Sequence, residues 1–187
     1  RFSDRESAVD WTPTATNQAG GVQLSSGSEI IGALRTRQEI LIWTDVGIVS
    51  MRFVGEPFVF SFTEVAEGPS LIGPNAAVSA NNRVYFMDAG GFYAYSGSAE
   101  KIQCTVLDYV LSDLNQDQSF KVFAAVNNIA NEIMWFYPSG TNTEIDKYVL
   151  YNYLENVWSI GTTDDGFVRT AWDQASILEY PIAASKN

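Results

Sequence analysis

Apolar positions along the chain gather in short runs that are separated by turn residues. Three segments repeat one pattern, in which two apolar runs flank a polar or glycine-containing turn: 39–53, 82–95 and 131–153. Trp43 and Phe86 stand 43 positions apart, and so do Asp45 and Asp88. Phe86 and Trp135 stand 49 positions apart, with the extra residues ahead of the strand. The pattern predicts a repeat of aromatic-rich β-hairpins.

Each hairpin is preceded by a run of small apolar residues and followed by a further strand-like run. The preceding runs are 31–34, 76–80 and 122–126, and the following runs are 58–62, 101–105 and 156–160. Periods of roughly 40–50 residues with four strands each are typical of propeller blades. We therefore predict an all-β fold, a β-propeller with about three complete four-stranded blades at 31–66, 76–106 and 121–161, and partial blades at 1–24 and 167–187.

The second strand of each unit carries apolar residues on both faces. In the first unit, Ile40 and Ile42 alternate with Leu41 and Trp43. A strand with one face in water would alternate apolar and polar residues, so this pattern favours sheets that are packed on both sides. A β-sandwich shares most of these signals, but it gives no reason for a regular period.

One stretch departs from the strand pattern. From 106 to 120, the apolar residues Val106, Tyr109, Val110 and Leu114 recur at helical spacing with polar residues between them. This spacing predicts one short helix between two blades.

Both ends of the chain resemble incomplete blades. Residues 1–4 followed by Trp11 resemble the last half of a blade, whereas 167–172 and 180–184 resemble the first two strands of another. The chain begins at Arg1 without an initiator Met, so we expect a processed chain or a segment of a longer one. Two arrangements of the ends are considered. They would pair with each other to close a small propeller, or they would belong to a larger propeller, which is the arrangement that we prefer.

Composition narrows the classes of function. The 187 residues are 46% hydrophobic and only 18% charged, which excludes a disordered chain. The net charge of -11 repels phosphate, so we expect no sequence-specific nucleic-acid binding, although DNA can pass an acidic wall without adhering to it. The chain contains no apolar run of about 20 residues, so we expect no membrane segment.

Few residues are suited to catalysis or metal binding. The chain has no histidine, and its one cysteine, Cys104, lies in an apolar-alternating stretch typical of a buried side chain. Asp45 and Asp88 could pair as catalytic carboxylates, but turn formation explains both at lower cost. Asp164 and Asp165 form an incomplete Ca²⁺ ligand set. We therefore predict a non-enzymatic protein with no catalytic, metal or cofactor-binding residues.

The aromatic residues allow two interpretations, a sugar-stacking platform or packing between blades. Packing is favoured for those at repeated strand positions: Trp43, Trp135, Tyr137, Tyr151, Tyr153 and Trp158. Tyr93 and Tyr95 lie in a hairpin beside the Gly90–Gly91 turn, and for them both interpretations stay open.

Five segments together resemble virion structural proteins of tailed bacteriophages and prophages: 10–20, 35–45, 73–76, 148–158 and 169–172. The similarity extends from Phe2 to about Ala184 and is to the β-propeller tail nozzle or packaged-DNA stabilisation proteins of short-tailed phages. It implies a ring of copies below the portal that contacts adaptor and distal tail proteins and lets genomic DNA pass. It also implies location in the virion tail, assembly in the host cytoplasm and no catalytic residues to carry over.

Two alternatives remain at this stage. One is a propeller-type carbohydrate-binding or depolymerase module of a phage tail, which a convergent carboxylate pair in an open cleft would favour. The other is a host-derived scaffold for protein contacts.

Overall fold

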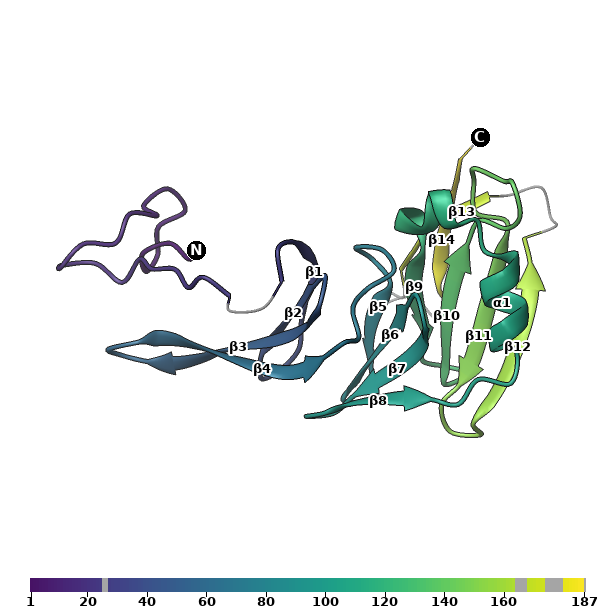
Figure 1. Cartoon of the computed structure of the whole chain (residues 1–187), viewed down its shortest axis with the longest axis horizontal. Coiled ribbons are helices and arrows are strands. Elements are labelled where there is room, and N and C mark those ends of the chain that lie inside the picture. The colour runs from purple at the N-terminus through teal and green to yellow at the C-terminus, as the bar shows by residue number, and fades with distance from the viewer. Residues whose placement is uncertain (25–26, 164–167, 174–179, 187) are drawn as a thin grey trace.

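The computed structural model describes residues 1–24, 27–163, 168–173 and 180–186. These residues form fourteen β-strands, one α-helix and one 3-10 helix, and Figure 1 shows their arrangement. The prediction of an all-β fold is therefore confirmed.

The first four strands form an antiparallel sheet in chain order, which we call sheet 1. They are β1 (Ile30–Arg35), β2 (Ile40–Thr44), β3 (Gly47–Gly55) and β4 (Val59–Glu67). The pairing of β2 with β3 ends at Met51, whereas β3 and β4 continue together to the turn after Gly55. This continuation, residues 52–61, projects from the body of the molecule (Figure 1), and we call it the arm.

Two more antiparallel sheets follow, each with its strands in chain order. Sheet 2 contains β5 (Ala77–Ala80), β6 (Arg83–Asp88), β7 (Gly91–Tyr95) and β8 (Ala99–Ile102). Sheet 3 contains β9 (Phe123–Asn127), β10 (Glu132–Tyr137), β11 (Lys147–Asn152) and β12 (Val157–Thr162). The three sheets thus lie at 30–67, 77–102 and 123–162, close to the units expected from the repeat.

The connection between sheets 2 and 3 is helical, but it is not one helix. The helix α1 (Leu107–Asp113) ends at Asp113, with Leu114 as its C-cap, and a 3-10 helix (Gln116–Lys121) follows. The break occurs because Asn115 donates its N–H to the carbonyl of Pro138, 2.9 Å away, and its side chain accepts from the N–H of Asp117. The expected helix at 106–120 is therefore divided at a residue that bonds to sheet 3 and caps the next turn.

The two ends of the chain differ from each other. Near the C-terminus, β13 (Val168–Asp173) and β14 (Ile182–Lys186) form a two-stranded antiparallel sheet, sheet 4, where two strands were expected. The half blade expected at 1–24 was wrong, since no strand lies there and only Phe2 and Gly20 form an isolated bridge.

Local hydrogen bonds explain the irregular N-terminal segment. The hydroxyl of Ser7 accepts from the N–H of Asp10, and the side chain of Asn17 accepts from the N–H of Thr14. Such bonds offer the backbone an alternative to a strand ladder. The segment instead packs against the arm, where the rings of Phe2 and Phe60 lie 4.9 Å apart.

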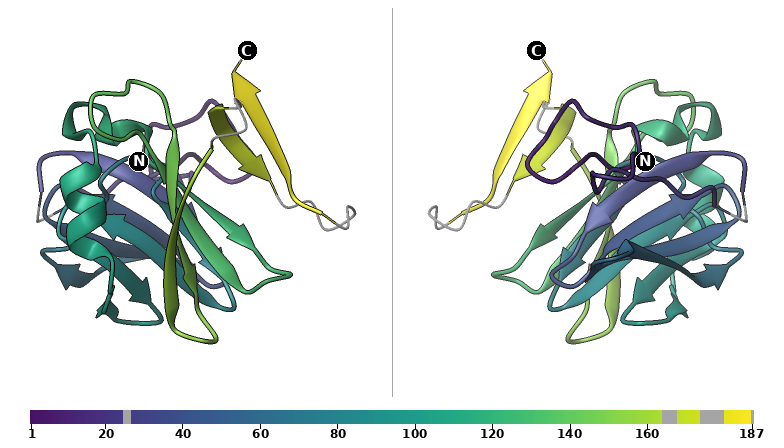
Figure 2. Two further views of the ribbon diagram at one scale, coloured as in Figure 1. Left: turned by 90° about the vertical axis from the view of Figure 1, so that its right-hand side faces the viewer. Right: turned by 90° about the vertical axis from the view of Figure 1, so that its left-hand side faces the viewer.

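The sheets are arranged as a fan, with the first strand of each along one side (Figure 2). Strand β1 contacts β5, β5 contacts β9, and β9 contacts β13. The approach is close: a Cβ on Gly32 would lie 2.8 Å from the carbonyl oxygen of Pro74, so only glycine fits. The N–H of Ala124 also donates to the carbonyl of Asn75, 2.8 Å away, which joins sheets 2 and 3.

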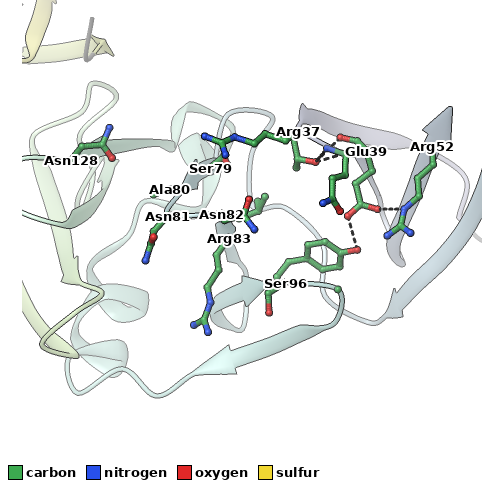
Figure 3. Close-up of a pocket in the computed structure, with 15 residues that line it drawn as sticks. Arg37, Glu39, Arg52, Ser79, Ala80, Asn81, Asn82, Arg83, Ser96 and Asn128 are labelled. Carbon is green, nitrogen blue, oxygen red and sulfur yellow. Dashed lines mark hydrogen bonds and ion pairs between the residues drawn. The ribbon is translucent and has the colours of Figure 1, made fainter. Parts of the chain in front are cut away.

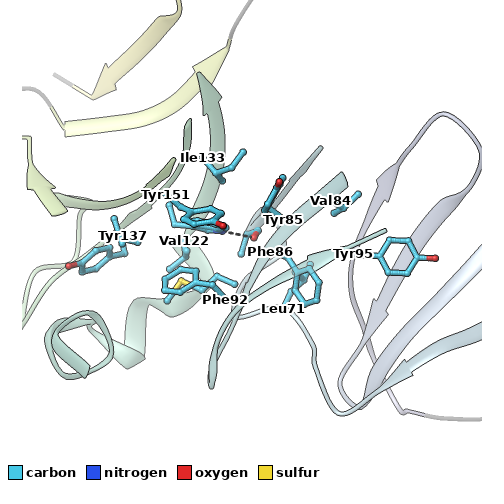
Figure 4. Close-up of a cluster of buried hydrophobic side chains, with 14 of the residues drawn as sticks. Leu71, Val84, Tyr85, Phe86, Phe92, Tyr95, Val122, Ile133, Tyr137 and Tyr151 are labelled. Carbon is cyan, nitrogen blue, oxygen red and sulfur yellow. Dashed lines mark hydrogen bonds between the residues drawn. The ribbon is translucent and has the colours of Figure 1, made fainter. Parts of the chain in front are cut away.

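Aromatic side chains fill the space between the sheets (Figure 4). The ring of Phe92 in sheet 2 lies 4.7 Å from that of Trp135 and 4.8 Å from that of Trp158 in sheet 3. The six aromatic residues expected in the core all pack there, and three of them, Trp43, Trp135 and Tyr137, are fully buried. The other three are Tyr151, Tyr153 and Trp158. Burial of one such side chain contributes about 1.5–3 kcal/mol, so these contacts hold the fan together.

The structure corrects the equivalence between Trp43 and Phe86. In sheet 1, Trp43 of β2 pairs with Ile48 of β3, next to the turn that joins these strands. In sheet 2, the residue at the same position of β6 is Met87, which pairs with Phe92 of β7. Met87, and not Phe86, is therefore the counterpart of Trp43. A shift of one residue turns a side chain to the other face of a strand. Trp43 therefore faces sheet 2 and Phe86 faces sheet 1, and their rings meet edge-on at 5.5 Å.

Candidate functional site

A polar pocket lies between sheets 1 and 2, at the rim where the first hairpin turn of each sheet is found (Figure 3). We call it the rim pocket, and its volume is about 530 Å³. Its lining combines the two turns with residues from β3, the β7–β8 turn and sheet 3: Thr36, Arg37, Gln38, Glu39, Arg52, Ser79, Ala80, Asn81, Asn82, Arg83, Val84, Tyr95, Ser96, Gly97 and Asn128.

Turn chemistry places the polar side chains of this pocket. Asn81 and Asn82 have φ values of 46° and 60°, the left-handed conformation that a two-residue hairpin turn requires and that Asn tolerates. In sheet 1, the hydroxyl and the N–H of Thr36 both donate to the carbonyl of Glu39 at 2.8 Å. These turns place Arg37 at the tip of one hairpin and Arg83 directly after the other.

Glu39 connects the two sheets. One of its carboxylate oxygens accepts from the hydroxyl of Ser50 and from Nε of Arg52, 2.8 Å away, within sheet 1. The other accepts from the hydroxyl of Tyr95 in sheet 2 at 3.0 Å. The side chain of Glu39 is only 8% exposed, and Figure 3 shows it beside Arg52.

This network fixes the protonation of its members. Burial opposes the ionisation of Glu39, but the hydrogen bonds from Ser50, Arg52 and Tyr95 outweigh it and leave the pKa of Glu39 below its usual value. Burial raises the pKa of Tyr95, and its bond to the Glu39 carboxylate raises it further. Glu39 is therefore ionised at neutral pH, and Tyr95 is a neutral donor.

The pocket is suited to binding rather than to acid–base catalysis. Among the described residues that line the pocket, Glu39 is the only carboxylate, whereas three are arginines. Glycoside hydrolysis requires two carboxyl groups, one of which stays protonated to act as the acid. The described lining of the rim pocket offers one carboxylate instead of two, and the lowered pKa of Glu39 keeps that carboxylate ionised.

The carboxylates selected from the sequence serve local structure. Asp45 accepts from the N–H and hydroxyl of Ser28 at 2.8 and 2.7 Å, and these bonds lower the pKa of Asp45. Asp88 accepts from the N–H groups of Ser70 and Gly90, each at 2.7 Å. The expectation that Asp45 and Asp88 occupy equivalent positions was wrong. The side chain of Asp88 accepts from the N–H of Gly90, two residues later, and in sheet 1 it is Thr44 that accepts in this way from the N–H of Val46. Thr44, and not Asp45, is therefore the counterpart of Asp88.

The remaining candidates are placed as follows. Cys104 is half-buried, and burial raises its pKa. Tyr95 is 3% exposed, and Tyr93 is half-buried with its ring stacked on Phe86, so neither offers an open platform. Asp164 and Asp165 lie outside the described residues. Within the described residues, no group of three or more Cys, Asp or Glu side chains is arranged to hold a metal ion.

The arm is a second candidate site, and no pattern in the sequence indicates that it projects. Phe53, Val54 and Phe58 at its tip are 72%, 53% and 76% exposed. Gln18 of the N-terminal segment donates to the carboxylate of Glu56 at 2.6 Å, which joins that segment to the arm. The arm therefore presents aromatic surface at a distance from the packed sheets.

No protein-family model and no curated protein matches this chain. Neither α1 nor the 3-10 helix, the helices found in the described part of the chain, is long and apolar enough to cross a bilayer.

Proposed function

We propose that the chain is a non-enzymatic segment of a β-propeller that serves in the tail of a tailed bacteriophage. Two features support a propeller: three successive four-stranded sheets, and first strands that contact one another in the order β1, β5, β9 and β13. Propeller blades place their first strands around a central channel. The resemblance of five chain segments to phage tail proteins supports location in the virion tail.

The arm is the observation that carries an assembly role. Scattered exposed apolar residues are ordinary, but Phe53, Val54 and Phe58 are all exposed within six positions of one hairpin. A projecting apolar tip can reach a neighbouring subunit that the packed sheets cannot reach. In the proposed assembly, arms join copies of the chain into a ring that contacts portal, adaptor and distal tail proteins.

The charge of the chain supports a channel role. With a net charge of -11, the chain repels the phosphate backbone and gives DNA little non-specific affinity. Genomic DNA would therefore pass such a ring without adhering to it. Assembly in the host cytoplasm and residence in the virion tail follow from this proposal.

A depolymerase receives less support from the geometry. Asp45 and Asp88 are each engaged by serine N–H groups, and Glu39 is the only carboxylate that lines the rim pocket. The carboxylate pair that would favour hydrolysis is therefore missing from the lining of the rim pocket.

Assembly is tested on the full-length protein by native mass spectrometry and negative-stain microscopy. We expect ring-shaped oligomers, and we expect the Phe53→Ser/Phe58→Ser variant to shift the protein towards monomers. Phe120→Ser is the matched control, because Phe120 is 58% exposed but lies outside the arm. A monomeric wild-type protein, or arm variants that assemble like the wild type, would contradict the assembly role.

The location is tested separately. Mass spectrometry of purified tailed-phage particles from the strain that encodes the chain should detect it in the tail fraction. Its absence from particles, together with a gene outside any phage cluster, would favour the host-derived scaffold instead.

A further inference from the structure

The rim pocket is a basic site on an acidic chain. Its charged lining consists of Arg37, Arg52, Arg83 and Glu39, although the chain has 22 acidic and only 11 basic residues. Arg52 is paired with Glu39. Arg37 and Arg83 take part in none of the ion pairs formed among the described residues. The guanidinium group of Arg83 interacts with the hydroxyl of Tyr85, which is a neutral group. The charges of Arg37 and Arg83 are therefore not paired with a carboxylate of the described residues, and both can attract an anion.

Neutral hydrogen-bonding groups lie between these two arginines. Arg37 and Arg83 extend to opposite sides of the Asn81–Asn82 turn in Figure 3, and Ser79 and Ser96 lie close to that turn in the chain fold. Amide and hydroxyl side chains both donate and accept hydrogen bonds, which suits the hydroxyl groups of a sugar. A guanidinium group presents a planar set of donors that fits a carboxylate or phosphate.

We propose that the rim pocket binds a sugar carrying an acidic group, of one to three rings. Its acidic group pairs with Arg37 or Arg83, and its hydroxyls bond to the asparagine and serine side chains. The volume of about 530 Å³ is within the usual range of small-molecule pockets. This proposal does not depend on the assembly role, because Phe53, Val54 and Phe58, which carry that role, do not line the pocket. Arg52 is common to the pocket and the arm, but its charge is paired with Glu39.

A nucleic-acid strand fits the same pocket less well. Single-stranded nucleic acids bind largely by stacking their bases on exposed aromatic rings. Tyr95, the only aromatic residue found in the described part of the lining, is 3% exposed, and its hydroxyl donates to Glu39. The net charge of -11 also opposes a ligand with one phosphate per residue.

Binding is tested by titration calorimetry on the whole chain with four probes. The probes are trigalacturonate, glucose 6-phosphate, neutral maltotriose and oligothymidine. We expect trigalacturonate or glucose 6-phosphate to bind, with an affinity that falls as salt is raised, and the stronger of the two identifies the acidic group. We expect no binding of maltotriose. Stronger binding of oligothymidine, or no binding of either acidic sugar, would overturn the proposal.

Variants then locate the site. Arg37→Gln and Arg83→Gln keep the side-chain length and remove the charge, and the double variant should lose at least about tenfold in affinity. Arg35→Gln is the matched control, since Arg35 is exposed at the end of β1 and does not line the pocket. Thermal melts confirm that each variant folds. Equal losses in the Arg35 control and the double variant would show non-specific attraction and refute the site.

Discussion

The bond between Tyr95 and Glu39 provides a sharp test of how sheets 1 and 2 are joined. Tyr95→Phe removes one hydroxyl, which lies 3.0 Å from the Glu39 carboxylate, and leaves the ring in place. Tyr95 is 3% exposed and the Glu39 side chain 8% exposed, so water can replace the lost donor only in part. The substitution should therefore weaken the contact between the sheets without creating a cavity.

The magnitude follows from the type of bond. A hydrogen bond to a charged group contributes about 1.5–3 kcal/mol to stability. Because Glu39 keeps its bonds from Ser50 and Arg52, we expect a loss near the lower end, about 1–2 kcal/mol. For a chain of this size, that corresponds to a fall in Tm of about 3–6 °C.

The same bond predicts the dependence on pH. The pKa of Glu39 is lowered in the folded protein, so its contribution is fully present above the unfolded pKa, near 4.5, and is lost as the pH falls through the folded pKa. The difference in stability between wild type and Tyr95→Phe should therefore be largest at neutral pH. It should shrink in acid, where Glu39 becomes protonated.

The assay is urea unfolding of the wild type, Tyr95→Phe, Glu39→Gln and the double variant. The cycle should give a coupling of about 1 kcal/mol between the two side chains. Tyr93→Phe is the matched control on the same strand, because the ring of Tyr93 stacks on Phe86 while its hydroxyl takes no hydrogen bond within the described residues. A Tyr95→Phe variant as stable as the control, or a coupling near zero, would show that this hydrogen bond does not hold sheets 1 and 2 together.

Two further predictions concern the core and the cysteine. Trp135→Phe should cost about 2–4 kcal/mol in denaturant unfolding, because Trp135 is fully buried and its indole N–H donates to the carbonyl of Ala76 at 3.1 Å. Trp11→Phe, at a 45% exposed position, should change stability little, and equal losses would contradict the packing argument. Since burial raises the pKa of Cys104, iodoacetamide should modify it slowly at neutral pH in the folded chain and much faster in urea. Rapid modification of the folded chain would contradict that burial.

Some local features could not be predicted because the decisive partner lies far away in the chain. The helix expected at 106–120 is divided at Asn115, whose N–H donates to the carbonyl of Pro138, directly after β10 of sheet 3. The N-terminal segment contains strand-like residues, yet its own Ser and Asn side chains bond to its backbone and Phe2 packs on Phe60. Spacing along the chain carries no information on either contact.

The rim pocket shows the same limit for a candidate site. Asn81 and Asn82 mark a tight turn in the sequence, but nothing near Glu39 indicates that Tyr95 will meet it from another sheet. The aspartates that did stand out, Asp45 and Asp88, bond to nearby loops. The sequence repeat indicates which residues form turns. It does not indicate the rim pocket, because the pocket is formed by side chains of different repeats that face each other.

The strands and turns of the three four-stranded sheets could be located from the amino-acid sequence, because apolar alternation and the backbone preferences of Gly, Asn and Asp act over a few neighbouring residues. Tertiary packing sets which face each strand presents and which side chains meet across the sheets. A shift of one position between Trp43 and Phe86 leaves the apolar pattern almost unchanged, yet it turns the two rings towards each other. That choice depends on packing between sheets, which no single strand contains.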